Sequence, residues 1–202
     1  MKYHYTFPTA IFEDNNIELS SKMLPLAIKY LDTYGSKFLD NPNHISTAKN
    51  KIVEELIIND PEIKPFMDFM FHQCNEFLKF QRINYKKYKY NPYITFNKIT
   101  KTGYHKLHSH PNSIVSGCFY LDVPKDSSKI LFLDPRDYHR YTNLETNFNE
   151  GAGDPNCLHP EIIKQVNTGD FLMWNSWLQH EVLPNLVDSP RYTMVFNIGI
   201  NL

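Results

Sequence analysis

Three histidines in the second half of the sequence have the spacing of a metal site. His108 and His110 are separated by one residue, so on an extended strand both imidazoles project from the same face and can reach one point. His180 follows about 70 residues later, after an apolar run that indicates a buried strand. His105 lies an odd number of residues from His108 and is expected to face elsewhere unless the strand bulges. The pattern indicates one metal centre, with incidental or buried, hydrogen-bonded histidines as the alternative interpretation.

A buried cation is predicted shortly after His180. Arg191 opens the last apolar run, on which Arg191, Thr193, Val195 and Asn197 share one strand face. A guanidinium inside a barrel is costly to bury unless an anion pairs with it. Arg191 is therefore expected either to bind an anionic ligand or to pair with a local carboxylate at the mouth of the strand, such as that of Asp188.

These residues need a scaffold of short strands to position them. In the second half of the chain, alternating apolar runs are separated by turn residues such as those at 102–103 and 111–112. The pattern predicts eight strands, over residues 93–100, 104–110, 114–122, 129–133, 161–166, 171–174, 180–183 and 191–199. Eight short strands of this kind indicate a jelly roll, and Trp174 and Trp177 beside the last histidine are expected in the core or the pocket wall.

The first 90 residues have helical rather than alternating spacing. Asp60 is placed to cap a helix, because a proline and then an apolar stripe at helical spacing follow it. Ser20 or Ser21 is the expected cap of an earlier helix, and the apolar residues Ile52 and Leu56 suggest a third helical segment between these two. The fold class predicted is therefore mainly β with N-terminal helices (α+β), in which residues 1–90 are a helical support region for residues 91–202.

Residues 134–160 form a long polar segment between two predicted strands. Compact domains seldom keep a loop of this length without a function, which makes a lid over the site the expected role. Its candidate substrate contacts are Asp134, Arg136, Tyr138 and His139, although Asp134 and Arg136 could equally belong to a structural turn.

Length and composition restrict the classes of protein that the chain can represent. A chain of 202 residues is expected to form a single domain, and a formal net charge of -1 gives no general attraction to nucleic acid. No stretch is apolar enough to span or bind a membrane, and no signal peptide is evident at the N-terminus. The 3 scattered cysteines suit a reducing compartment, so a cytoplasmic location is expected. The oligomeric state cannot be predicted from these features.

Four segments carry a resemblance to a known family. HSHPNSIVSGCFYLDVP, FLDPR, GDFLMWNSWLQHEVLP and SPRYTMVFNIG resemble the prolyl-4-hydroxylase-related 2-oxoglutarate/Fe(II)-dependent oxygenases, most closely a bacterial and phage branch. The resemblance covers residues 90–201 and implies a double-stranded β-helix, the cupin-like form of the jelly roll. It also implies an iron site and a hydroxylase that consumes 2-oxoglutarate and O2 and releases succinate and CO2.

The resemblance assigns roles to individual residues. It implies that His108 and His180 are the two histidine ligands of Fe(II), and that Arg191 with Thr193 binds the distal carboxylate of 2-oxoglutarate. His110 departs from the pattern, because the family usually has Asp or Glu at this position. Three neutral imidazoles can hold Fe(II), and the expected metal set is therefore His108, His110 and His180.

Three functional hypotheses follow. The first is a 2-oxoglutarate-dependent hydroxylase acting on a peptide, an amino acid or another small polar substrate. The second is a cupin-like three-histidine metalloenzyme without 2-oxoglutarate, in which Arg191 binds the carboxylate of the substrate itself. The third is a noncatalytic jelly-roll binding or structural protein, in which the histidines are buried polar residues or hold an inert metal.

Overall fold

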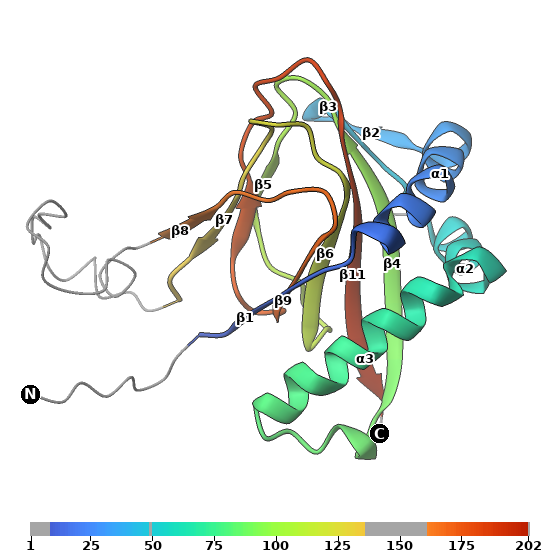
Figure 1. Ribbon diagram of the computed structural model, residues 1–202, viewed down its shortest axis with the longest axis vertical. Helices are drawn as coiled ribbons and strands as arrows, with labels where there is room; N and C mark the ends of the chain where they lie inside the picture. Colours follow the sequence, from blue (N-terminus) through green and yellow to red (C-terminus); the bar gives the residue numbers. More distant parts are fainter. Residues whose placement is uncertain (1–8, 49, 136–160, 202) are drawn as a thin grey trace, which may run out of the picture.

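The computed structural model describes residues 9–48, 50–135 and 161–201 as two antiparallel sheets with helices on one side (Figure 1). In chain order the elements are β1 (Ile11–Asn15), α1 (Ile17–Tyr34), β2 (Ser36–Phe38), β3 (Asn41–Ser46), α2 (Lys51–Asn59), the 3-10 turn η1 (Pro61–Ile63), α3 (Lys64–Phe80), the 3-10 turn η2 (Tyr85–Lys87), β4 (Lys89–Ile99), β5 (His105–His108), β6 (Val115–Asp122), β7 (Ile130–Leu133), β8 (Glu161–Lys164), β9 (Asp170–Asn175), β10 (His180–Val182) and β11 (Arg191–Asn201).

The two sheets have the interleaved order of a double-stranded β-helix. The larger sheet has seven strands in the order β1-β9-β6-β11-β4-β3-β2, and the smaller has four in the order β5-β10-β7-β8. From β4 onward the chain passes back and forth between the two sheets, so strands distant in sequence become neighbours. The predicted jelly roll flanked by helices is confirmed, and all eight predicted strands are present with shifted ends.

Two cores hold these layers together. The larger core lies between the helices and the outer face of the seven-stranded sheet, where Phe66 of α3 stacks on Phe119 of β6 with ring centroids 5.7 Å apart. The smaller core lies between the sheets and includes Tyr120 and Trp174. The helices therefore brace one face of the large sheet and leave its other face to the site between the sheets (Figure 1).

The first half of the chain also contributes strands that the sequence pattern does not predict. Strand β1 pairs with β9, while β2 and β3 extend the large sheet beyond β4. The sequence of β3, NPNHIS, contains proline and two asparagines, residues that are depleted in strands. Its pairing with β4 outweighs this unfavourable local propensity.

The predicted cap of the first helix needs correction. Helix α1 is capped by Asn16, whose Oδ1 accepts from the Leu19 N–H at 3.0 Å, and not by the serines at positions 20 and 21. Both serines lie inside the helix, where each hydroxyl donates to the Ile17 carbonyl. Polar residues of this type compete equally well for several backbone positions, so sequence alone does not select the cap.

Asp60 is confirmed as a cap, but of the turn η1, which leads into α3. The predicted third helical segment is confirmed as α2, in which Val53 and Ile57 are buried while Ile52 and Leu56 are exposed. Within the part of the chain that the structure describes, no helix is both long and apolar enough to cross a membrane.

Candidate metal centre

The three predicted histidines lie together at the edge of the smaller sheet. His108 ends β5 and His180 begins β10, and these two residues face each other across the antiparallel pair. His110 follows two residues after His108, beyond the end of the strand. One nitrogen atom from each of the three imidazoles lies within 4.8 Å of the other two. The Nε2 atoms of His110 and His180 are 3.3 Å apart, a separation that suits two ligands held about 2.1 Å from one ion.

Backbone carbonyls fix the orientation of two of these imidazoles. The Nδ1 of His108 lies 2.7 Å from the Lys106 carbonyl, and the Nδ1 of His180 lies 2.9 Å from the Leu178 carbonyl. Because a carbonyl can only accept, each Nδ1 carries the proton and each Nε2 presents its lone pair. This is the tautomer that a metal ligand needs, so the donor set fits a divalent transition metal.

Burial keeps the three imidazoles neutral. Desolvation lowers the pKa of His180 to about 3 and that of His110 to about 4, and it also lowers the pKa of His108. For His110 and His180 the neighbouring imidazoles act in the same direction, because a charge on one disfavours a charge on the next. All three histidines are therefore ready to bind a metal at neutral pH without first losing a proton.

A buried polar network supports the segment that carries His110. The backbone N–H of His110 donates to the Ser176 carbonyl at 2.9 Å. The Ser176 hydroxyl lies 2.7 Å from that of Ser116, which in turn donates to Asn197 Oδ1 at 2.6 Å. Fully satisfied networks of this type rigidify their surroundings, which gives His110 a defined position outside regular structure.

His105 lies in the same cavity, contrary to the expectation from strand alternation. The pairing of β5 with β10 has a bulge, since His180 faces His108 while Val182 faces His105. The extra residue turns the ring of His105 inward, where it stacks on that of His108 with centroids 4.1 Å apart. A bulge of this type leaves no clear signal in the sequence.

Arg191 is buried in the same cavity and has unused donor capacity. It is 1% exposed, and its Nη1 donates to the hydroxyl of Ser128 at 2.8 Å and to the carbonyl of Ser128 at 3.3 Å. Its Nε is buried with no hydrogen-bond partner among the described residues, and so is the hydroxyl of Tyr120, whose ring centroid lies 4.8 Å from the guanidinium carbon. The alternative pairing with Asp188 is not present, because Asp188 instead binds Lys101 at 2.8 Å.

An uncompensated buried guanidinium is expensive, so this site fits an anion. Among the residues that the structure describes, no carboxylate lies within ion-pair distance of Arg191. The predicted inward face of β11 is confirmed, because Arg191, Thr193, Val195 and Asn197 all line the cavity. Sequence reasoning missed Tyr120 and Ser128, since β6 is buried on both faces and shows no alternation that would single out Tyr120.

The cavity has a volume of about 260 Å³ and contains the metal cluster and Arg191 together. Trp174 lines it, as expected, whereas Trp177 is 54% exposed and does not. Asp134 is half-buried and is not among the lining residues. The remaining predicted substrate contacts, Arg136, Tyr138 and His139, lie outside the described residues, as does most of the predicted lid.

Solved structures with similar folds include enzymes that act on different substrates. A prolyl-4-hydroxylase from Pseudomonas putida is 10% identical, with a TM-score of 0.62 over 95% of this chain and 92% of that one. A prolyl hydroxylase from Trichoplax adhaerens, solved with a hypoxia inducible factor peptide fragment, is 15% identical, with a TM-score of 0.56 over 94% and 83%. HygX from Streptomyces hygroscopicus, solved with nickel, 2-oxoglutarate and hygromycin B, is 13% identical, with a TM-score of 0.53 over 95% and 83%.

At these identities the similarity establishes the fold alone. The sequence has no significant match among the curated proteins. A family model does match, over residues 95–197, and its description is "Putative 2OG-Fe(II) oxygenase". The match covers half of the chain, from the middle of β4 to β11, and includes the three histidines and Arg191. The chain therefore belongs to the 2OG-Fe(II) oxygenase family, for which Fe(II) is the cofactor and 2-oxoglutarate the cosubstrate.

Proposed function

We propose that this protein is a hydroxylase that uses Fe(II), O2 and 2-oxoglutarate on a small polar substrate, an amino acid or a peptide. The observation that carries the proposal is the presence, in one small cavity, of three converging imidazoles and a buried arginine with an unsatisfied Nε. A metal site alone suits many proteins, whereas a metal site beside an unpaired buried cation suits a ligand that chelates the metal and carries a second carboxylate.

In this proposal His108, His110 and His180 hold the iron. The carbonyls that accept from the Nδ1 atoms of His108 and His180 keep both rings in position before the metal arrives. Three protein ligands leave the other coordination positions open for the cosubstrate and oxygen. With these bound, the centre couples the oxidative decarboxylation of 2-oxoglutarate to succinate and CO2 with hydroxylation of a substrate C–H bond.

Arg191 and Thr193 bind the distal carboxylate of 2-oxoglutarate in this proposal. The Nη1 of Arg191 is held by Ser128 and the ring of Tyr120 packs against the guanidinium, so the cation is fixed while its Nε remains available. Thr193 follows on the same face of β11 and lies opposite Tyr120 in the sheet. The surrounding apolar walls exclude water and so strengthen the charge interaction.

Anaerobic isothermal titration tests the proposal. The full chain is titrated with Fe(II) and then with 2-oxoglutarate, and the Arg191→Gln variant is compared with Arg82→Gln, which removes an exposed arginine. We expect 2-oxoglutarate to bind only after the metal, and Arg191→Gln to weaken this binding about tenfold or more while the control does not.

Other outcomes point to other functions. Metal binding without 2-oxoglutarate binding would favour a three-histidine metalloenzyme in which Arg191 binds the substrate directly. That second candidate rests on His110, which stands where a carboxylate ligand is usual in the family. Failure to bind either would favour a noncatalytic role.

A further inference from the structure

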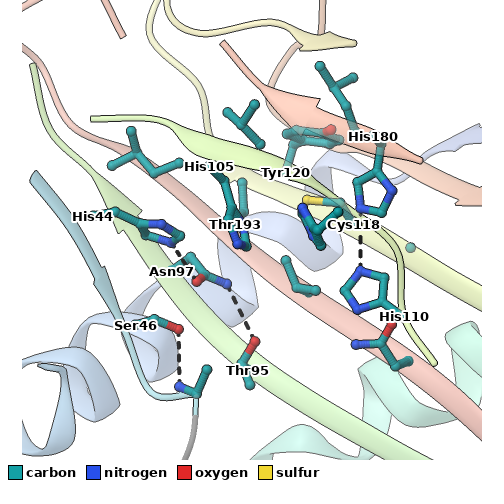
Figure 2. A pocket seen from close by; sticks show the side chains of 18 of the residues that line it. His44, Ser46, Thr95, Asn97, His105, His110, Cys118, Tyr120, His180 and Thr193 are labelled. Atoms are coloured by element: carbon teal, nitrogen blue, oxygen red, sulfur yellow. Dashed lines mark hydrogen bonds between the residues drawn. The ribbon is translucent and has the colours of Figure 1, made fainter. Parts of the chain in front are cut away.

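The cavity extends beyond the residues assigned to the metal and to 2-oxoglutarate. On the side formed by β3 and β4 it is lined by His44, Ser46, Thr95 and Asn97. All four are buried, with exposures of 2%, 1%, 3% and 7% respectively. Figure 2 shows this group on one side of the cavity, with His110 and His180 on the opposite side. We refer to these four residues as the β3–β4 wall.

The β3–β4 wall continues a polar row that begins beside the proposed 2-oxoglutarate site. Tyr120 faces Thr193 across the pair β6–β11, Thr193 faces Asn97 across β11–β4, and Asn97 faces Ser46 across β4–β3. Paired residues of neighbouring strands project from the same face, so four strands present a continuous polar surface to the cavity. Strand β3, which adds Ser46 and His44 to this surface, lies outside the eight strands of the β-helix.

The β3–β4 wall offers hydrogen-bond donors to a ligand. The Nε2 of His44 lies 2.9 Å from Asn97 Oδ1, and Asn97 Nδ2 donates to Thr95 Oγ1 at 3.4 Å. The hydroxyl oxygen of Ser46 accepts from the Ala48 N–H at 3.0 Å. These contacts use the oxygen atoms as acceptors. Within the described part of the chain, three donors are left for a bound group, namely the hydroxyl hydrogens of Ser46 and Thr95 and the second amide hydrogen of Asn97.

The charge of the cavity favours a negatively charged group. Its described lining residues include the cation Arg191 and no Asp or Glu. A neutral imidazole at position 110 adds no negative charge to the metal centre, whereas the usual carboxylate would add one. With a divalent ion, Arg191 and dianionic 2-oxoglutarate in place, one positive charge is left over. In a buried site such a charge is costly unless an anion lies close to it.

We infer that the β3–β4 wall binds a carboxylate of the substrate, which makes the substrate a free organic acid or amino acid. This inference rests on the proposed function and narrows its substrate class. A residue inside a polypeptide carries no free main-chain carboxylate, so a peptide offers a carboxylate only in an acidic side chain or at its C-terminus, and the size of the cavity disfavours such a chain. The cavity volume of about 260 Å³ lies below the range of about 300–1,000 Å³ usual for small-molecule sites, so the substrate that enters beside 2-oxoglutarate is small.

The test uses three small probes with the same carbon skeleton, namely propionate, propionamide and L-alanine. The full chain is loaded with Co(II) in place of Fe(II), with and without saturating 2-oxoglutarate, and the paramagnetic relaxation of the probe methyl protons is measured by NMR. We expect propionate or L-alanine to bind about tenfold more tightly than propionamide, which has no charge. L-alanine binding more tightly than propionate would identify amino acids as the substrates, and the reverse would identify simple organic acids.

Two variants and a control locate the binding. Asn97→Asp keeps the size of the side chain but places a negative charge in the wall, and is expected to abolish the preference for the carboxylate probes. Ser46→Ala removes one donor and is expected to weaken carboxylate binding severalfold. Asn91→Ala, on the exposed end of the same strand β4, should leave binding unchanged.

The inference would be overturned if the methyl protons of propionate and propionamide showed equal paramagnetic relaxation, or if Asn97→Asp left this relaxation unchanged. Failure of 2-oxoglutarate to bind would instead count against the proposed function. In that case the comparison of propionate with propionamide in the Co(II) protein, with and without Asn97→Asp, still decides whether the wall binds carboxylates.

Discussion

The imidazole of His105 stacks on that of His108, with ring centroids 4.1 Å apart and an interplanar angle of 24°. The rings of His44 and His105 pack in a T-shaped arrangement with centroids 5.0 Å apart, and Phe38 stacks on His44 at 4.5 Å and contacts His105 at 5.7 Å. A cluster of rings from β2, β3 and β5 therefore packs against a proposed iron ligand. Residues that orient a metal ligand commonly affect metal affinity without touching the metal.

His105→Ala should therefore weaken metal binding. Loss of the stacked ring frees the imidazole of His108 to rotate about its side chain, and we expect the Kd for Fe(II) or Co(II) to rise about tenfold. His105→Phe should keep most of the affinity, because it restores the stack without a metal-binding atom. Anaerobic titration measures the effect, with His72→Ala on the exposed face of α3 as control. Equal losses in the Ala and Phe variants would show that stacking is not the cause.

Tyr120→Phe should weaken cosubstrate binding without destabilising the protein. The Tyr120 hydroxyl is buried with no hydrogen-bond partner among the residues that the structure describes, and burial, with a smaller contribution from the Cys118 thiol, raises its pKa well above the usual value. Removing an unsatisfied buried hydroxyl should leave the ligand-free protein as stable as before or raise its free energy of unfolding by about 1 kcal/mol. The same change should weaken 2-oxoglutarate binding severalfold. Urea unfolding and titration measure the two effects, and a marked loss of stability would contradict this view of the hydroxyl.

The metal-free protein should lose stability as the pH falls below the pKa of an ordinary histidine. Burial lowers the pKa of His105 to about 2, that of His180 to about 3 and that of His110 to about 4, each from a usual value of 6.5. Between pH 6.5 and these values the unfolded chain binds more protons than the folded one. The stabilisation from the neutral histidines is therefore complete above pH 6.5 and is lost as the pH falls toward 4 and below.

Urea unfolding at pH 7.5, 6.0 and 5.0 in the presence of a chelator measures this loss. Each histidine contributes at most about 1.4 kcal/mol per pH unit. His105→Phe should make the dependence shallower, since it removes one titrating group from the cavity. A free energy of unfolding that stays constant between pH 7.5 and 5.0 would contradict the burial of neutral imidazoles.

Gly117→Ala should destabilise the protein severely. A Cβ at this position would lie 2.1 Å from Phe196 Cζ and 2.5 Å from the Leu172 carbonyl oxygen, so β6 has no room for a methyl group. Overpacking of this type costs about 1–3 kcal/mol, and contact with backbone puts this site at the upper end. Gly199→Ala is the control, because its nearest contact is 3.2 Å. Thermal unfolding of both variants tests the prediction, which similar midpoints would refute.

The sequence predicts the part of the site that follows from strand periodicity. Alternation along the last strand places Arg191 and Thr193 in the cavity. The predicted convergence of His108 and His110 is found as well, although His110 lies beyond the end of β5 and is held there by its hydrogen bond to Ser176. The positions that depart from regular geometry are not predictable in this way. The bulge that turns His105 inward depends on the pairing of β5 with β10, which local sequence does not encode.

The β3–β4 wall could not be predicted from the sequence for a similar reason. Strand β3 has a polar sequence with proline and asparagine, and it forms a strand because β2 and β4 pair with it. His44 and Ser46 therefore give no sign of their place in the cavity until the register of the large sheet is known. Long-range pairing, rather than residue type, brings them beside the proposed active site.

The binding of iron by three histidines and of 2-oxoglutarate by Arg191 is tested most directly by an anaerobic crystal structure of the protein with Fe(II) and 2-oxoglutarate, with anomalous data collected at the iron edge. We expect one iron peak at about 2.0–2.3 Å from the three histidine nitrogens, with the distal carboxylate of 2-oxoglutarate bound to Arg191. An iron peak without His110 as a ligand, or a 2-oxoglutarate molecule that makes no contact with Arg191, would contradict it.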